Sequence, residues 1–268
     1  MDFYNFAEQH GLIIDHLLLD RWVRCPTTDK PHSKNGAYIY DGQSGAVQNW
    51  AVHEKPVSWH DKNKKHDPQL AVRKAKSTID QATKQKQAAG KASWILDQCI
   101  KQTHSYMAKK GFPNEKVNVW NSMMVIPMRI DGSLTGIQLI SEDGKKTFLT
   151  GQKNKGASTI IDNKGKVILC EGVATAMSIR RALKAVKTRY KIVICFSAGN
   201  ILEVSKLYPE CVIVADNDAV GTRVAKNASK IYCVPPGAGE DFNDYEVRVG
   251  AKTAGEFLIA SIPLGRVE

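Results

Sequence analysis

One stretch of the sequence decides the fold: KVILCEGVATAMSI (Lys166–Ile179), KIVICFSAGN (Lys191–Asn200) and CVIVADNDAVGTRVAKNASKIYCV (Cys211–Val234). It contains three apolar runs rich in Val and Ile, each ending at a polar or glycine-containing turn: Val167–Cys170, Ile192–Phe196 and Val212–Ala215. Helix-like segments follow the first and third runs, at Ala174–Ala185 and Thr222–Ser229. Short continuous apolar strands that alternate with helices predict a parallel sheet covered on both faces.

Acidic residues follow the ends of these strands. Glu171 follows the first strand, Asp216 and Asp218 follow the third, and Asp241 and Asp244 lie on the next connection, GEDFNDY (Gly239–Tyr245). Ligands of parallel α/β sheets bind beyond the carboxyl ends of the strands, so we expect these acids to share one site. Carboxylates gathered without matching basic residues repel one another and need a cation, and hard oxygen ligands favour Mg²⁺ or Mn²⁺. The pattern therefore predicts one or two divalent ions acting on phosphate.

Each of these pieces also has a purely structural interpretation. A Glu before a helix interacts favourably with the helix dipole, and Asp-Asn-Asp before a Gly is typical of a capped turn. Neither interpretation explains why both features occur at strand ends with the spacing of an α/β repeat.

These motifs resemble the Toprim domain, which has Glu-Gly after one strand (here Glu171-Gly172) and Asp-x-Asp after another (here Asp216-Asn217-Asp218). That domain is shared by DnaG-type primases, topoisomerases and OLD-type nucleases. EGVATAMSI, FSAGNILEV, ADNDAVG and GEDFND are similar to the Toprim primases of plasmids and phages, the TraC-like and satellite-phage alpha-type group. Upstream, HSYMAKKGF (His104–Phe112), MVIPMRIDGSLTGIQLISEDGKKTFLTG (Met124–Gly151) and KGASTII (Lys155–Ile161) resemble the segment that precedes Toprim in that group.

The resemblance implies a DNA primase that makes short RNA primers from NTPs on single-stranded DNA, for a plasmid, phage or other mobile element. It implies catalytic roles for Glu171, Asp216 and Asp218, which together with Asp241 and Asp244 would hold Mg²⁺ or Mn²⁺, with two ions expected. Glu171 is either a ligand or the proton-transfer group. DnaG-type primases carry Asp-x-Asp in the last motif, whereas Asn243 stands second here, so the last ligand is either Asp241 or Asp244. The implied nucleotide-binding residues are Lys145, Lys146, Lys155, Gly172 and Asn200; Gly172 and the helix after it would offer backbone N–H groups to phosphate.

The amino-acid composition limits the classes of protein to which the chain can belong. The chain has 268 residues and 43% hydrophobic residues, enough for a real core, and its net charge of +11 indicates an anionic partner. Six scattered cysteines without a CxxC pair argue against a disulfide framework and favour a reducing cytoplasm. No apolar run approaches the ~18 residues of a membrane span, and no signal-peptide pattern is present, so we expect a soluble, cytoplasmic protein without a membrane partner.

Residues 1–61 are predicted to form a small N-terminal α+β unit. Phe3–Leu19 has helical periodicity broken near Gly11, and the turn Asp41–Gly45 separates strand-like residues around Ile39 from Ala46–Val52. A zinc ribbon often occupies this region in such primases, but the spacing of the four candidates does not match one, so zinc is not expected; these candidates are Cys25, His32, His53 and His60. Trp50 and Trp59 lie near basic residues and either stack bases of single-stranded DNA or belong to the core.

Residues 62–91 carry nine Lys or Arg against two Asp, a net charge of +7. Gln69–Ala89 lacks Pro and Gly and predicts a basic helix. It is either a solvated linker helix or a grip on DNA phosphates through its basic residues, and the two interpretations are compatible. The candidate contacts are Arg73, Lys74, Lys76, Lys84, Lys86 and Lys91.

Residues 92–161 predict a helix over Ser93–Lys110, stopped at Gly111, and then a β-meander with turns at Asp131-Gly132 and Asp143-Gly144. The family resemblance makes this part a basic subdomain that binds nucleotide and template. The overall prediction is an α/β fold (α+β overall), in which the Toprim domain (162–255) follows the N-terminal unit, the linker helix and this subdomain, and precedes a tail (256–268).

Two other functions remain open. A Toprim nuclease would use the same acids to break a phosphodiester bond, and a non-catalytic accessory would bind single-stranded DNA only. A topoisomerase is disfavoured because no second domain offers a clear active-site Tyr. The sequence has no P-loop motif, so the chain would need a separate replicative helicase.

Overall fold

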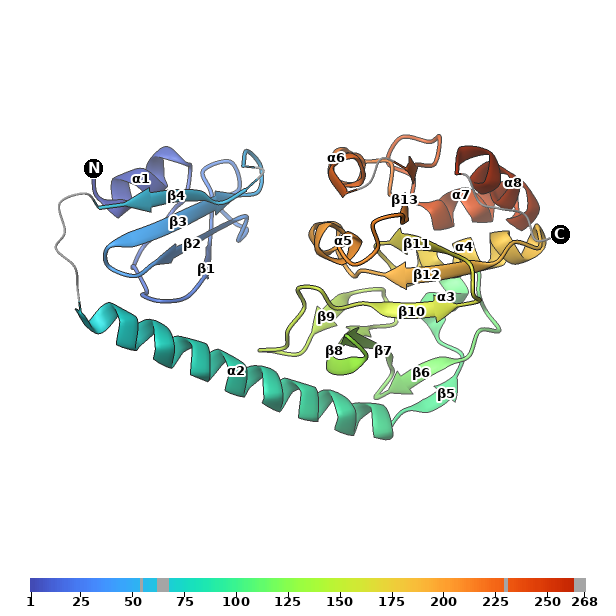
Figure 1. Cartoon of the computed structure of the whole chain (residues 1–268), viewed down its shortest axis with the longest axis horizontal. Helices are drawn as coiled ribbons and strands as arrows, with labels where there is room; N and C mark the ends of the chain where they lie inside the picture. The colour runs from blue at the N-terminus through green and yellow to red at the C-terminus, as the bar shows by residue number, and fades with distance from the viewer. Residues whose placement is uncertain (54, 62–67, 229–230, 263–268) are drawn as a thin grey trace. The chain divides into compact units, whose positions relative to one another are not determined.

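The computed structural model describes residues 1–53, 55–61, 68–228 and 231–262. Helices and strands are mixed along the chain (Figure 1), which divides into two compact units, Met1–Ala82 and Thr83–Glu268. This confirms the predicted α/β class. Among the described residues, no helix combines the length and the apolar character that crossing a bilayer requires. All six cysteines are free thiols, and five of them are buried.

The first unit contains a small antiparallel sheet, as predicted. Its elements are α1 (Phe3–Gln9), β1 (Val23–Cys25), β2 (Gly36–Tyr40), β3 (Ser44–Asn49) and β4 (Val57–His60), with the strands in sequence order. The predicted break near Gly11 is confirmed, but the helical periodicity after it, up to Leu19, does not form a helix. Gly11, with φ of +74°, takes the chain out of the helix, and the backbone at His16 and Leu18 then bonds to the hydroxyl of Tyr38. Ile14 and Leu17 pack on the sheet instead.

Helix α2 (Pro68–Asp97) is longer than the predicted basic helix. It continues through Gly90 because Ala88, Ala92 and Ile95, spaced one helical turn apart, are buried, and the last two pack in a core with Val125 and Ile137. The predicted helix over Ser93–Lys110 is therefore wrong: its first residues end α2 and its last residues form the short α3 (Ser105–Lys109). Residues 62–67 of the predicted linker helix lie outside the described residues, as do residues 263–268 of the predicted tail.

A five-stranded antiparallel sheet follows, confirming the predicted meander. Its strands are β5 (Ile100–Gln102), β6 (Val117–Trp120), β7 (Met123–Ile130), β8 (Ser133–Ile140) and β9 (Lys146–Phe148), in sequence order. Asp131 and Gly132 both have positive φ, of 48° and 79°, as the two-residue turn between β7 and β8 requires. Strand β9 is an edge of this sheet, and β5 is the opposite edge.

The predicted parallel sheet is present in the second unit with strand order β10-β12-β11-β13-β14. Strands β11, β12, β13 and β14 run parallel, and β10 is an antiparallel edge. Sequence reasoning missed β10, β14 and three helices, α5, α7 and α8. The elements are β10 (Thr159–Asp162), β11 (Lys166–Cys170), α4 (Val173–Ala185), β12 (Tyr190–Ile194), α5 (Ala198–Ser205), β13 (Val212–Val214), α6 (Ala219–Ala228), β14 (Tyr232–Cys233), α7 (Phe242–Val249) and α8 (Ala251–Ser261).

The two faces of this sheet bury different side chains. Ile168 and Cys170 of β11 face a core built with α4, α7 and α8, whereas Leu169 faces one built with α5 and α6. The first of these cores also contains side chains of the antiparallel sheet, among them Met124 and Ile140. One continuous core therefore fixes the antiparallel sheet against the parallel one within the second unit.

Candidate active site

Glu171 is the first acid of the site and lies where β11 ends. Its backbone oxygen accepts a hydrogen bond from Phe196 N at 2.8 Å, which joins the ends of β11 and β12. The backbone N–H of Ala198, in the first turn of α5, favours the ionised form of the Glu171 carboxylate and lowers its pKa. Glu171 thus interacts with the backbone that follows the neighbouring strand β12.

Asp216 and Asp218 follow β13, the strand next to β11 in the sheet. Asp218 caps α6: its Oδ1 accepts from Gly221 N at 2.6 Å. A Cβ at Gly221 would lie 2.5 Å from the backbone oxygen of Asp216, so only glycine lets the helix approach so closely. The ADNDAVG motif therefore contains the end of β13, the N-cap of α6 and the glycine that lets α6 begin close to the backbone of Asp216.

Asn217 brings the fourth acid to the site. Its side-chain nitrogen donates to the carbonyls of Pro235 and Gly237, at 2.9 and 2.8 Å, and its backbone N–H donates to Glu240 O. These bonds tie the loop before α7 to the end of β13. Asp241, the next residue of that loop, caps α7 by accepting from Asp244 N at 2.8 Å. Sequence reasoning read Asn217 only as part of a turn, and no local signal marked its long-range partners.

The acids at this edge oppose one another's ionisation. Burial raises the pKa of Asp216 to about 6, with help from the negative charges of Glu171, Asp241 and Asp218. Burial also raises the pKa of Glu171, and Asp218 raises it further, while the ammonium of Lys146 lowers it. Four of the five predicted acids thus lie close enough at this edge for their charges to act on one another.

The donor set fits a hard divalent cation. Four carboxylates whose charges repel one another in a partly buried site are the oxygen ligands that Mg²⁺ and Mn²⁺ favour. Within the described residues, no three His, Cys, Asp or Glu side chains are arranged so that they could hold a metal ion, so the fit rests on the chemistry of the carboxylates alone.

Lys146 is the predicted nucleotide-binding lysine whose charge acts on the acids. Its Nζ lies 3.6 Å from the point where a Cβ on Gly172 would stand, and its charge acts on both Glu171 and Asp216. Gly172 itself is the N-cap of α4 and makes no side-chain capping bond. The neighbouring Lys145 is exposed, and its backbone takes part in the turn with Ser141.

Lys155 and Asn200 line one pocket together. Lys155 is exposed and pairs with Glu203 at 3.2 Å. Asn200 is buried, and its amide bonds to the backbone of Gly156, Ala157 and Cys195 at 2.7–2.8 Å. Asn200 therefore orders the loop that carries Lys155 and the end of β12, and its amide is occupied by these bonds.

A second lysine, which sequence reasoning missed, lies beside Asp241. Lys110 Nζ is 3.6 Å from Asp241 Oδ2 and 3.4 Å from Asp244 Oδ1. Asn243, which stands at the variant position of the last motif, is buried and donates from Nδ2 to Lys110 O and Ser178 Oγ, at 2.9 Å each. Asn243 thus holds the lysine in place. Asp241 acts on Asp216, whereas Asp244 has a side chain 56% exposed and pairs with Lys110.

The predicted DNA contacts have different surroundings. Trp50 is 47% exposed, with the guanidinium of Arg24 4.0 Å above its ring. Trp59 is half-buried and packs edge-on against Phe3 at the core of the first unit, and its base-stacking role stays a prediction. Arg73 pairs with Asp20 and donates to Asp41 O. Four of the lysines are exposed on α2, and the side chain of Lys74 lies outside the described residues; the four are Lys76, Lys84, Lys86 and Lys91.

The zinc-ribbon candidates are occupied in other ways. Cys25 is buried in the core of the first unit. His53 Nδ1 accepts from Asn49 N at 3.0 Å and its Nε2 lies 2.9 Å from His10 Nδ1. His60 pairs with the hydroxyl of Ser44, and His32 is exposed.

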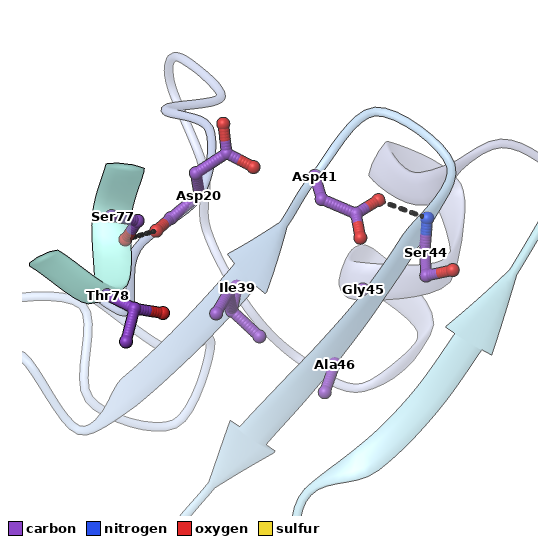
Figure 2. Close-up of a pocket in the computed structure, with 8 residues that line it drawn as sticks. All are labelled: Asp20, Ile39, Asp41, Ser44, Gly45, Ala46, Ser77 and Thr78. Carbon is purple, nitrogen blue, oxygen red and sulfur yellow. Dashed lines mark hydrogen bonds between the residues drawn. The ribbon is translucent and has the colours of Figure 1, made fainter. Parts of the chain in front are cut away.

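A separate pocket of about 440 Å³ lies within the first unit (Figure 2). Asp41 lines it from the end of β2 and accepts from Ser44 N at 2.7 Å, while Ser77 of α2 donates to Asp20 O at 3.4 Å. Asp20 and Asp41 are the charged residues among those that line it. None of the predicted site residues lines it.

The family model of the Toprim domain matches residues 166–252. That segment holds β11 to α7 and all five predicted acids.

Three solved primase structures are similar to this chain. The first is a chain from the complex of bacteriophage T7 lagging-strand DNA polymerase with the primase domains of two gp4 subunits, which are bound to an RNA/DNA hybrid and dTTP. It matches with a TM-score of 0.43 and 10% sequence identity, and the match covers 64% of this chain and 95% of that one. A DNA primase domain from Pseudomonas aeruginosa matches with a TM-score of 0.37 and 14% sequence identity, and the match covers 73% of this chain and 63% of that one. The DnaG primase catalytic domain bound to single-stranded DNA matches with a TM-score of 0.38 and 11% sequence identity, and the match covers 73% of this chain and 62% of that one.

The raised pKa of Asp216 predicts a pH-dependent stability effect. The protonated form of this carboxyl stabilises the fold below pH about 4, and this stabilisation is lost as the pH rises through about 6. Asp216→Asn, which removes the charge, should therefore raise the free energy of unfolding relative to wild type more at pH 7 than at pH 4. Urea unfolding at both values measures this difference. Glu256→Gln, on the exposed surface of α8, is the control; an equal effect of Asp216→Asn at both pH values contradicts the burial of Asp216 among acids.

Proposed function

We propose that this chain is a DNA primase, which joins NTPs into a short RNA primer on a single-stranded DNA template. The observation that carries the proposal is that Lys146, from the antiparallel sheet, reaches the acids of the segment that matches the Toprim domain. The site thus combines a carboxylate set suited to divalent ions with a cation suited to an anionic triphosphate.

The reaction is transfer of a nucleotide to a primer end. The 3′-hydroxyl oxygen forms a new bond to the α-phosphorus of the incoming NTP, the bond to the β-phosphate breaks, and pyrophosphate leaves. The hydroxyl must lose its proton, and Glu171, whose pKa is raised by burial, is suited to accept it at neutral pH. Asp216, Asp218 and Asp241 would hold Mg²⁺ or Mn²⁺, with Glu171 as a further ligand if it is not the base. When bound, such ions stabilise charge on the entering and leaving oxygens.

The two lysines have distinct roles in this proposal. Lys146 would pair with the triphosphate as a point charge. Lys110 holds Asp241 beside the other acids, because it pairs with that carboxylate and is itself fixed through Asn243. Gly172 would let phosphate approach the start of α4, where no side chain caps the helix. Lys145 and Lys155 are exposed cations at the borders of the same site.

The resemblance of the motifs to plasmid and phage primases supports service to a mobile element, with a separate helicase to open the duplex. The exposed lysines of α2 would contact template phosphates without regard to sequence. Trp50 has the guanidinium of Arg24 over its ring and is still partly exposed, and it would stack on a template base.

Primer synthesis is tested with purified protein, single-stranded DNA, labelled NTPs and Mg²⁺ or Mn²⁺, with products separated on a sequencing gel. We expect short labelled ladders from wild type and from Glu256→Gln. Asp218→Asn retains the cap of α6 but loses a charge, and it should reduce the ladders at least about a hundredfold. Glu171→Gln should do the same while leaving DNA binding intact. Shortened template without new chains would instead identify a nuclease, and intact template without new chains would favour an accessory.

The role of α2 has its own test. Replacing Lys84, Lys86 and Lys91 by Gln should lower the slope of log K against log salt concentration for a single-stranded oligonucleotide by about 0.7 for each phosphate that these lysines neutralise. Fluorescence anisotropy at several salt concentrations measures the slope. The control replaces three exposed lysines elsewhere in the second unit, Lys116, Lys184 and Lys252, with the same change in net charge. Equal slopes for the two triple variants would show a general charge effect and not a grip by α2.

A further inference from the structure

A cleft of about 330 Å³ lies in the second unit, beside the acids but outside them. Phe148 of β9 and Phe196 at the end of β12 line it, and Ser197 and Gly199 supply its wall toward α5. The cleft borders Glu171, because Ala198, whose backbone N–H acts on that carboxylate, lies between these last two residues. A cleft of this size is at the lower end of those that take small organic ligands.

Phe148 is an aromatic side chain on an edge strand that remains 39% exposed. It is two residues from Lys146, so both side chains stand on the same face of β9. Lys146 acts on Glu171 and Asp216, while Phe148 lines the cleft. A ligand that contacts both side chains must therefore have a flat apolar part beside an anionic part.

Phe196 forms the inner wall at a backbone conformation that bulky residues avoid. Its φ is +68°, in the left-handed region, although it is neither a glycine nor a polar turn residue. The strain is held by the bond from Phe196 N to Glu171 O and by Ser197, which caps α5 through a 3.3 Å bond from Asn200 N to Ser197 Oγ. Such strain concentrates at binding sites, where the surrounding structure maintains it.

The charges of the cleft are balanced. Lys155 at its rim pairs with Glu203 at 3.2 Å, and the remaining lining residues carry no charge. An uncharged ring system therefore suits the cleft better than a phosphate does. The cation available to an anionic group beside the cleft is Lys146, which lies toward the acids.

We propose that this cleft binds the nucleobase of a nucleoside triphosphate, stacked on Phe148, with the triphosphate directed to Lys146. The proposal deepens the proposed function and rests on it, since it names the base-binding part of the same site. Stacking on an aromatic ring tolerates every base, because every base has a π face. That tolerance suits a polymerising enzyme, which must accept four different nucleotides.

The test compares two ligands that share the triphosphate and differ in the base: ATP and inorganic tripolyphosphate, both in Mg²⁺ buffer. Calorimetry should show that Phe148→Leu weakens ATP binding about tenfold, the effect expected for one stacking interaction, and leaves tripolyphosphate binding unchanged. Phe148→Tyr, which keeps the ring, should bind both ligands as wild type does. Ile100→Ala is the matched control, since Ile100 is an exposed apolar residue on the opposite edge strand of the same sheet.

A second readout reports stacking itself. The fluorescence of 2-aminopurine riboside triphosphate should be quenched on binding to wild type and to Phe148→Tyr, and much less by Phe148→Leu. Equal weakening of ATP and tripolyphosphate binding in Phe148→Leu would overturn the proposal, as would unchanged ATP binding. If wild type binds tripolyphosphate as tightly as ATP, the proposed nucleobase site is wrong, whereas the proposed binding of the triphosphate at Lys146 is retained. If wild type binds neither ligand and makes no primers, the proposed function fails as well.

Discussion

Repulsion among partly buried carboxylates is the constraint on which the site depends. Strands β11 and β13 are neighbours in a parallel sheet, so Glu171 and Asp216 must leave it at the same edge. The Asn217 bonds then bring Asp241 to that edge, and the cap at Asp218 holds a further acid there. A fold that served stability alone would separate these groups. Their proximity, and the raised pKa of Asp216, are what a cation-dependent site requires.

The counter-charges come from outside the segment that matches the Toprim domain. Lys146 belongs to β9 and Lys110 follows α3, both before residue 166. They are held near the acids because the antiparallel sheet shares a core with one face of the parallel sheet, through residues such as Met124, Ile140 and Ile168. Removing this shared core would separate the lysines from the acids without changing either set. The two sheets of the second unit therefore act as one structure in forming the site.

The sequence predicted what depends on local pattern. Val and Ile runs ending in Glu171 and Asp216 indicated parallel strands with acids at their ends, and two Asp-Gly pairs indicated the hairpin turns. The pattern failed where tertiary packing decides. Gly90 suggested a helix end, but the buried face of α2 around Ala92 and Ile95 carries the helix through it. Trp59 is an aromatic residue near basic residues, and no local signal showed that it packs against Phe3 at the core of the first unit.

Other site features have no local signature at all. Lys110 meets Asp241 across more than a hundred residues of sequence, and Asn217 looks like any turn residue until its two carbonyl partners are seen. Phe148 and Lys146 become a pair only when β9 is known to be an edge strand beside the ends of β11 and β12. In each case the sequence showed the chemistry of the side chain, whereas the fold determined which residue is its partner.

The most direct measurement is a carbon-13 NMR titration of the aspartate carboxyl groups, with Asp216 assigned from the Asp216→Asn variant. Without divalent ions, Asp216 should titrate with a pKa of about 6. Saturating Mg²⁺ should lower that pKa, because a bound cation favours the ionised form. A carboxyl at Asp216 that titrates near the ordinary aspartate value of about 4, or a raised pKa that Mg²⁺ leaves unchanged, would contradict a cation site built from these acids.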